Sequence, residues 1–179
     1  MYGPVIEGKL VRLRPPKPED AAVMITWFED LEVTRFIMRR NPPSIGEENT
    51  FLENLAKDPN AIQWVVEFQG QPVGTTAIAQ IDWKNGSGMT GTIIGDKAVW
   101  GKGLARELMQ IRATFAFTHL PLRKLKSGYI DGNVASARAQ AAAGYHEIGR
   151  WQRDQFVEGE WRDLVLTELM REDWEKSRV

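Results

Sequence analysis

The chain has 179 residues, of which 42% are hydrophobic and 26% charged, and its formal net charge is −1 at pH 7. This size and balance predict one globular domain that buries its own core. The sequence contains no cysteine, which excludes disulfides, thiolate metal sites and a thiol nucleophile. Its start shows no basic end followed by an apolar run, and no apolar stretch approaches the ~20 residues that span a bilayer. We therefore expect a soluble, cytoplasmic protein with no membrane partner.

The charge is unevenly distributed along the chain. Residues 19–58 contain nine acids and four bases, whereas residues 97–126 contain seven bases and the single acid Glu107. A nucleic-acid surface would more often make the whole chain basic, so we expect no nucleic-acid partner. The local basic stretch favours either a small phosphorylated ligand or an ordinary solvated helix face.

The first half of the chain predicts a strand, two helices and a meander of three strands. Alternation makes residues 9–14 a strand, which the next two prolines end. An amphipathic helix follows over residues 18–29, and Ser44 with Glu47 three residues later forms a capping box that begins a second helix. The strands of the meander are expected at 63–68, 73–82 and 89–95.

The second half alternates helices and strands and closes with a hairpin. Apolar residues at helical spacing predict a long helix over residues 103–119, and Asn133 begins a short helix that ends at Gly144. Further strands are expected at 124–130, 145–156 and 162–170. These elements indicate a single domain over residues 1–179 of the α/β (α+β) class. Its sheet would be mixed and mostly antiparallel, with about six to seven strands flanked by helices.

A glycine-containing turn joins the strand at 89–95 to the helix at 103–119. Its sequence is Trp100-Gly101-Lys102-Gly103-Leu104-Ala105. Glycine lets a ligand approach the backbone, and a helix that starts here points unpaired N–H groups and its dipole at the same place, so phosphate is the natural occupant. The turn lacks the ending of a Walker loop and the three spaced glycines of a dinucleotide fingerprint, and an ordinary tight turn is the alternative.

A second motif, Asn133-Val134-Ala135-Ser136, begins a helix directly after the strand at 124–130. Asn133 is a good N-cap, and Ser136 can complete the cap. The strands at 89–95 and 124–130 each lead into a helix at the same edge of the sheet. We therefore expect these two strands to part there.

In combination and order, these motifs resemble the acetyl-CoA motifs of the GNAT N-acetyltransferases. The segments that carry the resemblance are Ile93 to Lys97, Trp100 to Ala105, Asn133 to Ser136 and Ala143 to Tyr145. The closing turn, Val157 to Asp163, is similar to the branch of ribosomal-protein alanine/serine N-acetyltransferases and bacterial spermidine N-acetyltransferases. The resemblance implies a GNAT-type domain with an acetyl-CoA motif at about 89–119 and a second motif at about 124–145.

The resemblance also implies roles for individual residues. The main chain of Ile93 and Ile94 would pair with the pantetheine arm of acetyl-CoA and polarise the thioester carbonyl. Asn133 would contact the pantetheine in the gap between the parted strands. The CoA diphosphate would be held mainly by backbone N–H groups. The residues implied in that role are Trp100, Gly101, Lys102, Gly103, Leu104, Ala105 and Arg106.

Two positions depart from the family pattern. The slot for a tyrosine that protonates the departing thiolate holds Gln140, which cannot act as an acid. The slot that often carries glutamate in the strand at 89–95 holds Thr90. Tyr145 is expected to pack in the core, which leaves Ser136 as the leading hydroxyl to orient the thioester sulfur or relay a proton.

A base is also needed, because a primary amine is mostly protonated near pH 7. The candidates are Asp82, Glu160 and Asp163, each of which is equally explained as a turn or rim residue. His119 and His146 lack metal-ligand spacing, so we expect no metal.

We therefore expect an acetyl-CoA-dependent N-acetyltransferase that transfers acetyl to a primary amine by direct attack in a ternary complex. The acceptor would be a protein N-terminus or a small-molecule amine. Acids at 29–32 and 47–53 would suit a polyamine or an aminoglycoside, although exposed helix acids explain them equally. The alternative is a non-catalytic acyl-CoA-binding module of the same fold, and the sequence leaves open whether the chain forms a homodimer.

Overall fold

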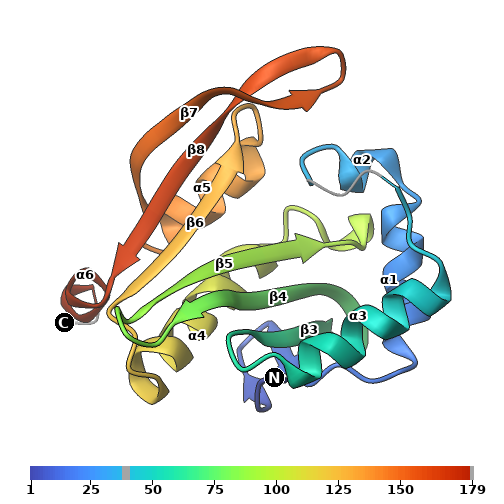
Figure 1. The fold of residues 1–179 in the computed structure, drawn as a ribbon, viewed down its shortest axis with the longest axis horizontal. Coiled ribbons are helices and arrows are strands. Elements are labelled where there is room, and N and C mark those ends of the chain that lie inside the picture. The colour runs from blue at the N-terminus through green and yellow to red at the C-terminus, as the bar shows by residue number, and fades with distance from the viewer. Residues whose placement is uncertain (38–40, 178–179) are drawn as a thin grey trace.

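Strand pairing joins the chain into one sheet (Figure 1). The computed structural model describes residues 1–37 and 41–177, and the eight strands of that part lie in the order β1-β2-β3-β4-β5-β6-β8-β7. Neighbouring strands are antiparallel except β5 and β6, which are parallel. The predicted class of sheet is confirmed, but six to seven strands was too few. The additional strand, β1, has two residues, too few for alternation to mark it.

The strands are β1 (Ile6–Glu7), β2 (Val11–Arg14), β3 (Ile62–Phe68), β4 (Gln71–Asp82), β5 (Ser87–Ile94), β6 (Lys124–Ile130), β7 (His146–Val157) and β8 (Glu160–Met170). The helices are α1 (Asp20–Phe28), α2 (Leu31–Thr34), α3 (Ile45–Lys57), α4 (Leu104–His119), α5 (Val134–Ala142) and α6 (Arg171–Lys176), with a 3-10 turn η1 (Lys97–Val99). Each predicted element is present. The short helices α2 and α6 were not predicted, because one turn of helix carries no periodic pattern.

Different helices cover the two faces of the sheet. Along β3, Trp64 and Val66 belong to the core that α4 and α5 cover, whereas Val65 between them belongs to the cluster under α1 and α3. This alternation is what a strand buried on both faces requires. No helix in the described part of the chain is long and apolar enough to cross a membrane.

The start of α3 follows the predicted capping box. Ser44 Oγ accepts the backbone N–H of Glu47 at 3.3 Å, and the Glu47 carboxylate accepts the backbone N–H of Ser44 at 2.7 Å. Two N–H groups that the helix leaves unpaired are thereby satisfied.

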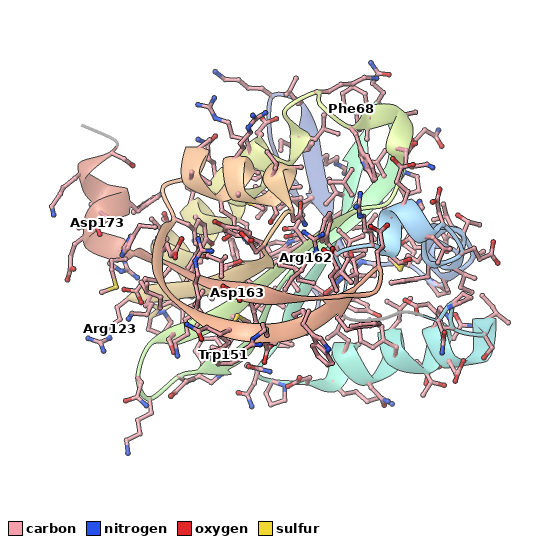
Figure 2. All side chains as sticks on the ribbon, turned by 90° about the horizontal axis from the view of Figure 1, so that it is seen from above. Phe68, Arg123, Trp151, Arg162, Asp163 and Asp173 are labelled. Carbon is pink, nitrogen blue, oxygen red and sulfur yellow. The ribbon has the colours of Figure 1, made fainter. Side chains whose placement is uncertain are left out.

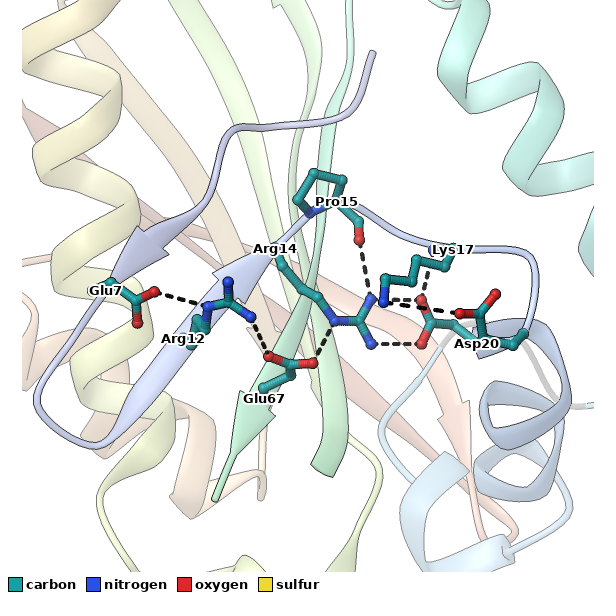
Figure 3. A network of polar contacts seen from close by, with 8 residues as sticks. Glu7, Arg12, Arg14, Pro15, Lys17, Asp20 and Glu67 are labelled. Atoms are coloured by element: carbon teal, nitrogen blue, oxygen red, sulfur yellow. Dashed lines mark hydrogen bonds and ion pairs between the residues drawn. The ribbon is translucent and has the colours of Figure 1, made fainter. Parts of the chain in front are cut away.

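A network of ion pairs ties the start of α1 to β2 and β3 (Figure 3). Arg14 donates to both carboxylate oxygens of Asp20 at 2.7 Å and to Glu67 at 2.5 Å, and Arg12 donates to the other oxygen of Glu67 at 3.1 Å. Arg14 and Asp20 are buried. Burial raises the pKa of the Glu67 carboxyl, but the hydrogen bonds from Arg14 and Arg12 outweigh it, and the pKa lies below its ordinary value.

Candidate active site

β5 and β6 form a fork (Figure 1). They pair in parallel over three residues only, the last of which are Met89 and Lys126. Thr90 Oγ1 then donates to the Lys126 carbonyl at 3.0 Å, and Ser127 Oγ donates to the Thr90 carbonyl at 3.3 Å. Beyond this point β5 pairs only with β4 and β6 only with β8. The predicted parting of the two strands is therefore confirmed.

Beyond the fork, the N–H and C=O groups of successive β5 residues point alternately to β4 and to the open edge. The Gly95 N–H donates to the Val73 carbonyl at 2.9 Å, and Ile93 lies in the same unbroken register with β4. In an antiparallel pair, residues that exchange both hydrogen bonds alternate with residues whose groups face away. Ile93 therefore directs its main chain to β4, whereas Thr92 and Ile94 direct theirs to the open edge. The prediction is corrected for Ile93, because its main chain faces β4. Thr92 faces the open edge in its place.

The glycine turn has the conformation that an anion site needs. Gly101 and Gly103 have φ of 76° and 83°, and a Cβ at either position would meet nothing within 4 Å, so the backbone is open to a ligand. Gly103 is the N-cap of α4 and provides no side-chain cap. The N–H groups of Leu104, Ala105 and Arg106 have no acceptor among residues 1–37 and 41–177. These groups and the helix dipole favour an anion here.

The basic stretch next to this turn divides into two kinds of residue. Lys97 is held by Asp30 at 2.7 Å and Glu32 at 2.9 Å, which joins η1 to α2. The hydrogen bond from Lys97 also lowers the pKa of the Asp30 carboxyl. The charge of Lys97 is therefore paired within the protein, as are the charges of Asp30 and Glu32.

Lys102 and Arg106 differ from Lys97 in having no carboxylate within ion-pair distance among the described residues. The Lys102 ammonium lies 5.6 Å from the centre of the Phe68 ring, which is labelled in Figure 2, and Arg106 is exposed. The nearby acid Glu107 accepts the backbone N–H groups of Lys9 and Leu10. Two cations therefore remain available beside the open end of α4.

Trp100 uses its side chain rather than its main chain at the site. The indole N–H donates to the Ile94 carbonyl at 2.9 Å, although Trp100 is 40% exposed. Because Ile94 directs its carbonyl to the open edge of β5, the indole occupies one of the acceptors at that edge. No local pattern predicts this contact, because it depends on how the turn folds back on the strand.

The start of α5 is closed by its own side chains. Asn133 Oδ1 accepts the Ser136 N–H at 3.1 Å, which is the predicted cap. Gln140 is 3% exposed and donates to Ser136 Oγ at 3.1 Å and to the Gly128 carbonyl at 3.0 Å, and it accepts from Thr167 at 2.5 Å. The residue in the slot of the family's tyrosine thus links α5 to β6 and β8.

Two residues at the base of the fork were not predicted as site residues. Arg112 of α4 is 1% exposed and contacts Thr76, Gly91 and Thr92. Its other terminal nitrogen lies 3.4 Å from the hydroxyl of Tyr145, which is buried in the core as expected. An arginine among the apolar residues of a long helix suggests a solvated position, so its burial could not be predicted.

The three candidate bases lie apart from one another. Asp82 pairs in register with Ser87, on the closed side of the fork, and hydrogen bonds from Asn85 lower the pKa of its carboxyl. Glu160 is the first residue of β8, next to the hairpin turn, and is bound to Arg162 at 2.9 Å. Asp163 accepts the backbone N–H of Arg153 at 2.9 Å; Figure 2 labels both Arg162 and Asp163. The structure does not bring Asp82 to the open end, which corrects its proposed role as the base.

The two histidines have ordinary surroundings. The His119 ring lies 5.4 Å from the ring of Phe115, and His146 Nε2 lies 3.7 Å from the Glu168 carboxylate. No group of three or more metal-ligating side chains occurs in the described part of the chain.

A cavity of about 230 Å³ lies across the fork from α5, between α2 and the β7–β8 hairpin. Its lining is Leu31, Thr34, Arg35, Ile37, Ile130, Gln155, Phe156, Val157 and Glu158. Ile130 is the last residue of β6, so the cavity opens where the two strands are furthest along their divergence. Arg35 and Glu158 form an ion pair of 2.5 Å that joins α2 to the hairpin. A second hollow, near Arg123 (Figure 2), lies at the closed end of the sheet.

The fork and the open start of α4 lie at the same end of the sheet, and the cavity lies beside the last residue of β6. The chain belongs to the acetyltransferase (GNAT) domain family, whose model matches residues 11–146. The predicted fold and enzyme class, an acetyl-CoA-dependent N-acetyltransferase, are confirmed by this match.

Individual relatives agree with the family. The chain is 23% identical over 167 residues to the uncharacterized N-acetyltransferase p20 of Bacillus licheniformis, covering 90% of this chain and 93% of that protein. It is 30% identical over 89 residues to the ribosomal protein uS5-alanine N-acetyltransferase of Escherichia coli, covering 49% and 45%. The fold matches spermidine N-acetyltransferase from Vibrio cholerae in complex with CoA and spermine, with a TM-score of 0.87, 20% identity and coverage of 94% and 99%.

Proposed function

We propose that the chain binds acetyl-CoA in the fork and acetylates the α-amine of a protein N-terminus. The single observation that supports this acceptor is the cavity beside the fork, whose lining among the described residues is mainly apolar, with one acid and one base.

The residues at the donor site fit CoA. The unpaired N–H groups at the start of α4 would hold the diphosphate, and no Cβ fills the space in front of Gly101 or Gly103. Lys102 and Arg106 would add positive charge. Thr92 and Ile94 would offer main-chain groups to the pantetheine arm. Bound acetyl-CoA would supply the activated acetyl group at the open edge of β5.

The cavity does not suit a polyamine. Among the described residues, its lining contains one carboxylate, Glu158, and that carboxylate is paired with Arg35. A polyamine carries several positive charges, each of which would have to leave water without a partner. A peptide end carries one amine, with carbonyl and apolar groups behind it, and matches a neutral lining better.

Three of the six acids expected to attract a cationic acceptor are used elsewhere. Asp30 and Glu32 hold Lys97, and Glu47 caps α3 through Ser44. These acids therefore serve ion pairs and a helix cap within the protein. This weakens the case for polyamines and aminoglycosides as acceptors.

Proton chemistry favours an α-amine as well. An α-amine has a pKa of about 7.7–8.0 against about 10.4 for an alkylamine, so at pH 7 roughly a tenth of it is neutral, against about one part in 2,500. Thr90 occupies the strand position where a carboxylate would assist, and Asp82 lies on the closed side of the fork. An acceptor that loses its proton readily makes the smallest demand on a base at this site. Ser136 remains the proposed hydroxyl for orienting the sulfur.

The test is release of free CoA from acetyl-CoA with a matched panel of amines. The panel comprises a lysine-free peptide with a free N-terminus, the same peptide with a blocked N-terminus and one lysine, spermidine and an aminoglycoside. We expect turnover with the free N-terminus alone, and mass spectrometry should place the acetyl group on it. Turnover with spermidine but not with the peptide would refute the acceptor, and CoA binding without turnover on any amine would favour the non-catalytic module.

A further inference from the structure

Arg112 is a buried positive charge without a counter-charge. Its side chain is 1% exposed, and no carboxylate lies within ion-pair distance among residues 1–37 and 41–177. Its Nε has no hydrogen-bond partner there. Removing an arginine from water without a carboxylate partner is costly, and a core of apolar residues at the same place would be cheaper. Hydrogen bonds to the two terminal nitrogens offset part of this cost, while Nε stays unpaired.

The hydrogen-bond partners of Arg112 all lie at the base of the fork. One terminal nitrogen donates to Thr76 Oγ1 at 2.6 Å, to the Gly91 carbonyl at 2.9 Å and to Thr92 Oγ1 at 3.0 Å. The other lies 3.4 Å from the Tyr145 hydroxyl, which lies 3.4 Å from Thr90 Oγ1. Arg112 therefore fixes the first two residues of β5 beyond its last contact with β6.

The position of Arg112 along α4 matches the position of Gly91 along β5. From Arg106 to Arg112, α4 advances by about 9 Å at ~1.5 Å per residue. From Ile94 back to Gly91, β5 advances by about 10 Å at ~3.3 Å per residue. Arg112 thus lies beside Gly91 at the base of the fork, and the proposed diphosphate site lies at the start of the same helix.

We propose that Arg112 is a positioning residue for acetyl transfer, which holds the β5 main chain at the base of the fork and makes that position favourable for negative charge. The inference rests on the proposed placing of acetyl-CoA in the fork. It extends the proposed function by assigning the stabilisation of the leaving sulfur to a residue of α4.

The chemistry of the transfer gives this charge a use. The acceptor nitrogen bonds to the acetyl carbon, the carbon–sulfur bond breaks with its electron pair going to sulfur, and the proton lost by nitrogen goes to water. A sulfur that leaves as an anion needs either a proton or a nearby positive charge. Gln140 cannot supply the proton and the Ser136 hydroxyl is a weak acid, so in this proposal Arg112 supplies the charge.

The test is a titration of the CoA thiol when it is bound, followed by the ultraviolet absorbance of the thiolate. A free thiol titrates near pH 8.5. With wild-type protein the bound thiol should titrate at least about one pH unit lower, which means a tenfold larger thiolate fraction at pH 7. In Arg112→Gln, which keeps a donor for the Gly91 carbonyl but removes the charge, that increase should be lost. Its kcat should fall by on the order of tenfold or more, with a smaller change in KM.

Two further variants separate charge from packing. Arg112→Lys keeps the charge, so the thiol should stay acidic while kcat falls less than in the glutamine variant. It also keeps the test decisive if Arg112→Gln does not fold. Arg171→Met is the matched control, because Arg171 also donates to carbonyls, at 2.9 Å to Leu122 and 3.0 Å to Leu120, but at the closed end of the sheet. It should lower stability and leave the thiol unchanged.

The results distinguish this inference from the proposed function. An unchanged thiol titration in folded Arg112→Gln, or the same change in Arg171→Met, would overturn the role of Arg112 alone. Equal thiol titration in the lysine and glutamine variants would also overturn it, because the charge would then have no effect. If Gly103→Val binds CoA as tightly as wild type, CoA lies elsewhere, and the inference fails together with the proposed donor site.

Discussion

Two helices begin beside the fork, and they differ in whether a side chain caps their N-terminus. α4 begins after Gly103, which has no side chain, and its first N–H groups are left open. α5 begins after Asn133, whose side chain accepts the Ser136 N–H and fills the same kind of position. The difference shows that an N-terminus becomes a ligand site only when the protein does not cap it. α4 is thus the helix suited to hold an anion, and α5 is suited to hold the sheet.

The N-terminus of α1 differs from both. The N-cap of α1, Glu19, provides no side-chain hydrogen bond, but the Asp20 carboxylate in the first turn accepts the Lys17 N–H at 2.6 Å. Arg14 holds that carboxylate in place. α1 therefore carries an anion of its own where α4 offers room for one from outside. Perturbing the three starts should affect stability, binding and turnover differently.

The largest effect is expected from Arg14→Met. The change leaves Asp20 buried without its cation, which should lower the free energy of unfolding by about 3–5 kcal/mol. Urea unfolding followed by circular dichroism measures this. CoA affinity of the folded fraction should not change, because the donor site lies on α4, and a large loss of affinity would show that α1 supports that site directly.

The same substitution should alter acid stability. The pKa of Glu67 lies below its ordinary value in the folded state, so its contribution is present above that ordinary value and is lost as pH falls through the folded-state pKa. Without Arg14 the folded-state pKa rises, and the loss of stability should begin at a higher pH. An unchanged acid limb would mean that Arg12 alone sets the pKa of Glu67.

Gly103→Val should be the largest effect on binding. A β-branched residue at a φ of 83° is strained, and its side chain would enter the space assigned to the diphosphate. We expect CoA affinity to fall by on the order of a hundredfold, measured by titration calorimetry. Gly159→Val is the control for strain, with a φ of 87° in the hairpin turn away from α4, and it should bind CoA normally.

Ser136→Ala tests whether α5 contributes chemistry in addition to its cap. The Ser136 hydroxyl accepts from Gln140, which orients it, and its own proton is available to a sulfur in the fork. We expect kcat to fall by on the order of tenfold, with acetyl-CoA affinity changed less. A rate equal to wild type would remove Ser136 from the mechanism.

Asn133→Ala should lower the free energy of unfolding by about 1 kcal/mol, because the cap of α5 is lost. Asn133→Asp keeps an oxygen acceptor and should recover most of that stability. CoA affinity separates the cap from the predicted pantetheine contact. If the aspartate variant is stable but binds CoA much more weakly, the Asn133 amide contacts the ligand, and if it binds normally, Asn133 is a cap alone.

Trp100→Phe is expected to have the smallest effect. It removes the donor that occupies the Ile94 carbonyl and leaves that carbonyl to the pantetheine arm. CoA affinity should rise by roughly two- to fivefold, the range expected for one exposed hydrogen bond. Weaker binding would show instead that the indole forms a wall of the channel.

Local signals explain what could be predicted from the sequence. Gly101 and Gly103 mark the turn because few other residues adopt its conformation, and Asn133 marks a cap because its side chain acts within three residues. Both signals lie within one segment of chain. The same applies to the periodic patterns that predicted the long helices and strands.

The remaining features depend on contacts between distant segments. Strand register places Asp82 on the closed side of the fork, and no local pattern reveals register. Arg112 is buried because β4 and β5 surround it, and Trp100 reaches Ile94 because the turn folds back. Glu158 meets Arg35 across the cavity, 123 residues apart in sequence. The acceptor side of the site was therefore the least predictable part.

The divided sheet has one further consequence. A strand edge is normally a surface feature, where unpaired N–H and C=O groups invite the addition of another chain. Here β5 and β6 of the eight-stranded sheet present two such edges to each other inside one domain. These edges could pair with the pantetheine arm of acetyl-CoA, which is narrow and carries amide groups. In this sense the donor substrate would serve as the strand that the sheet omits.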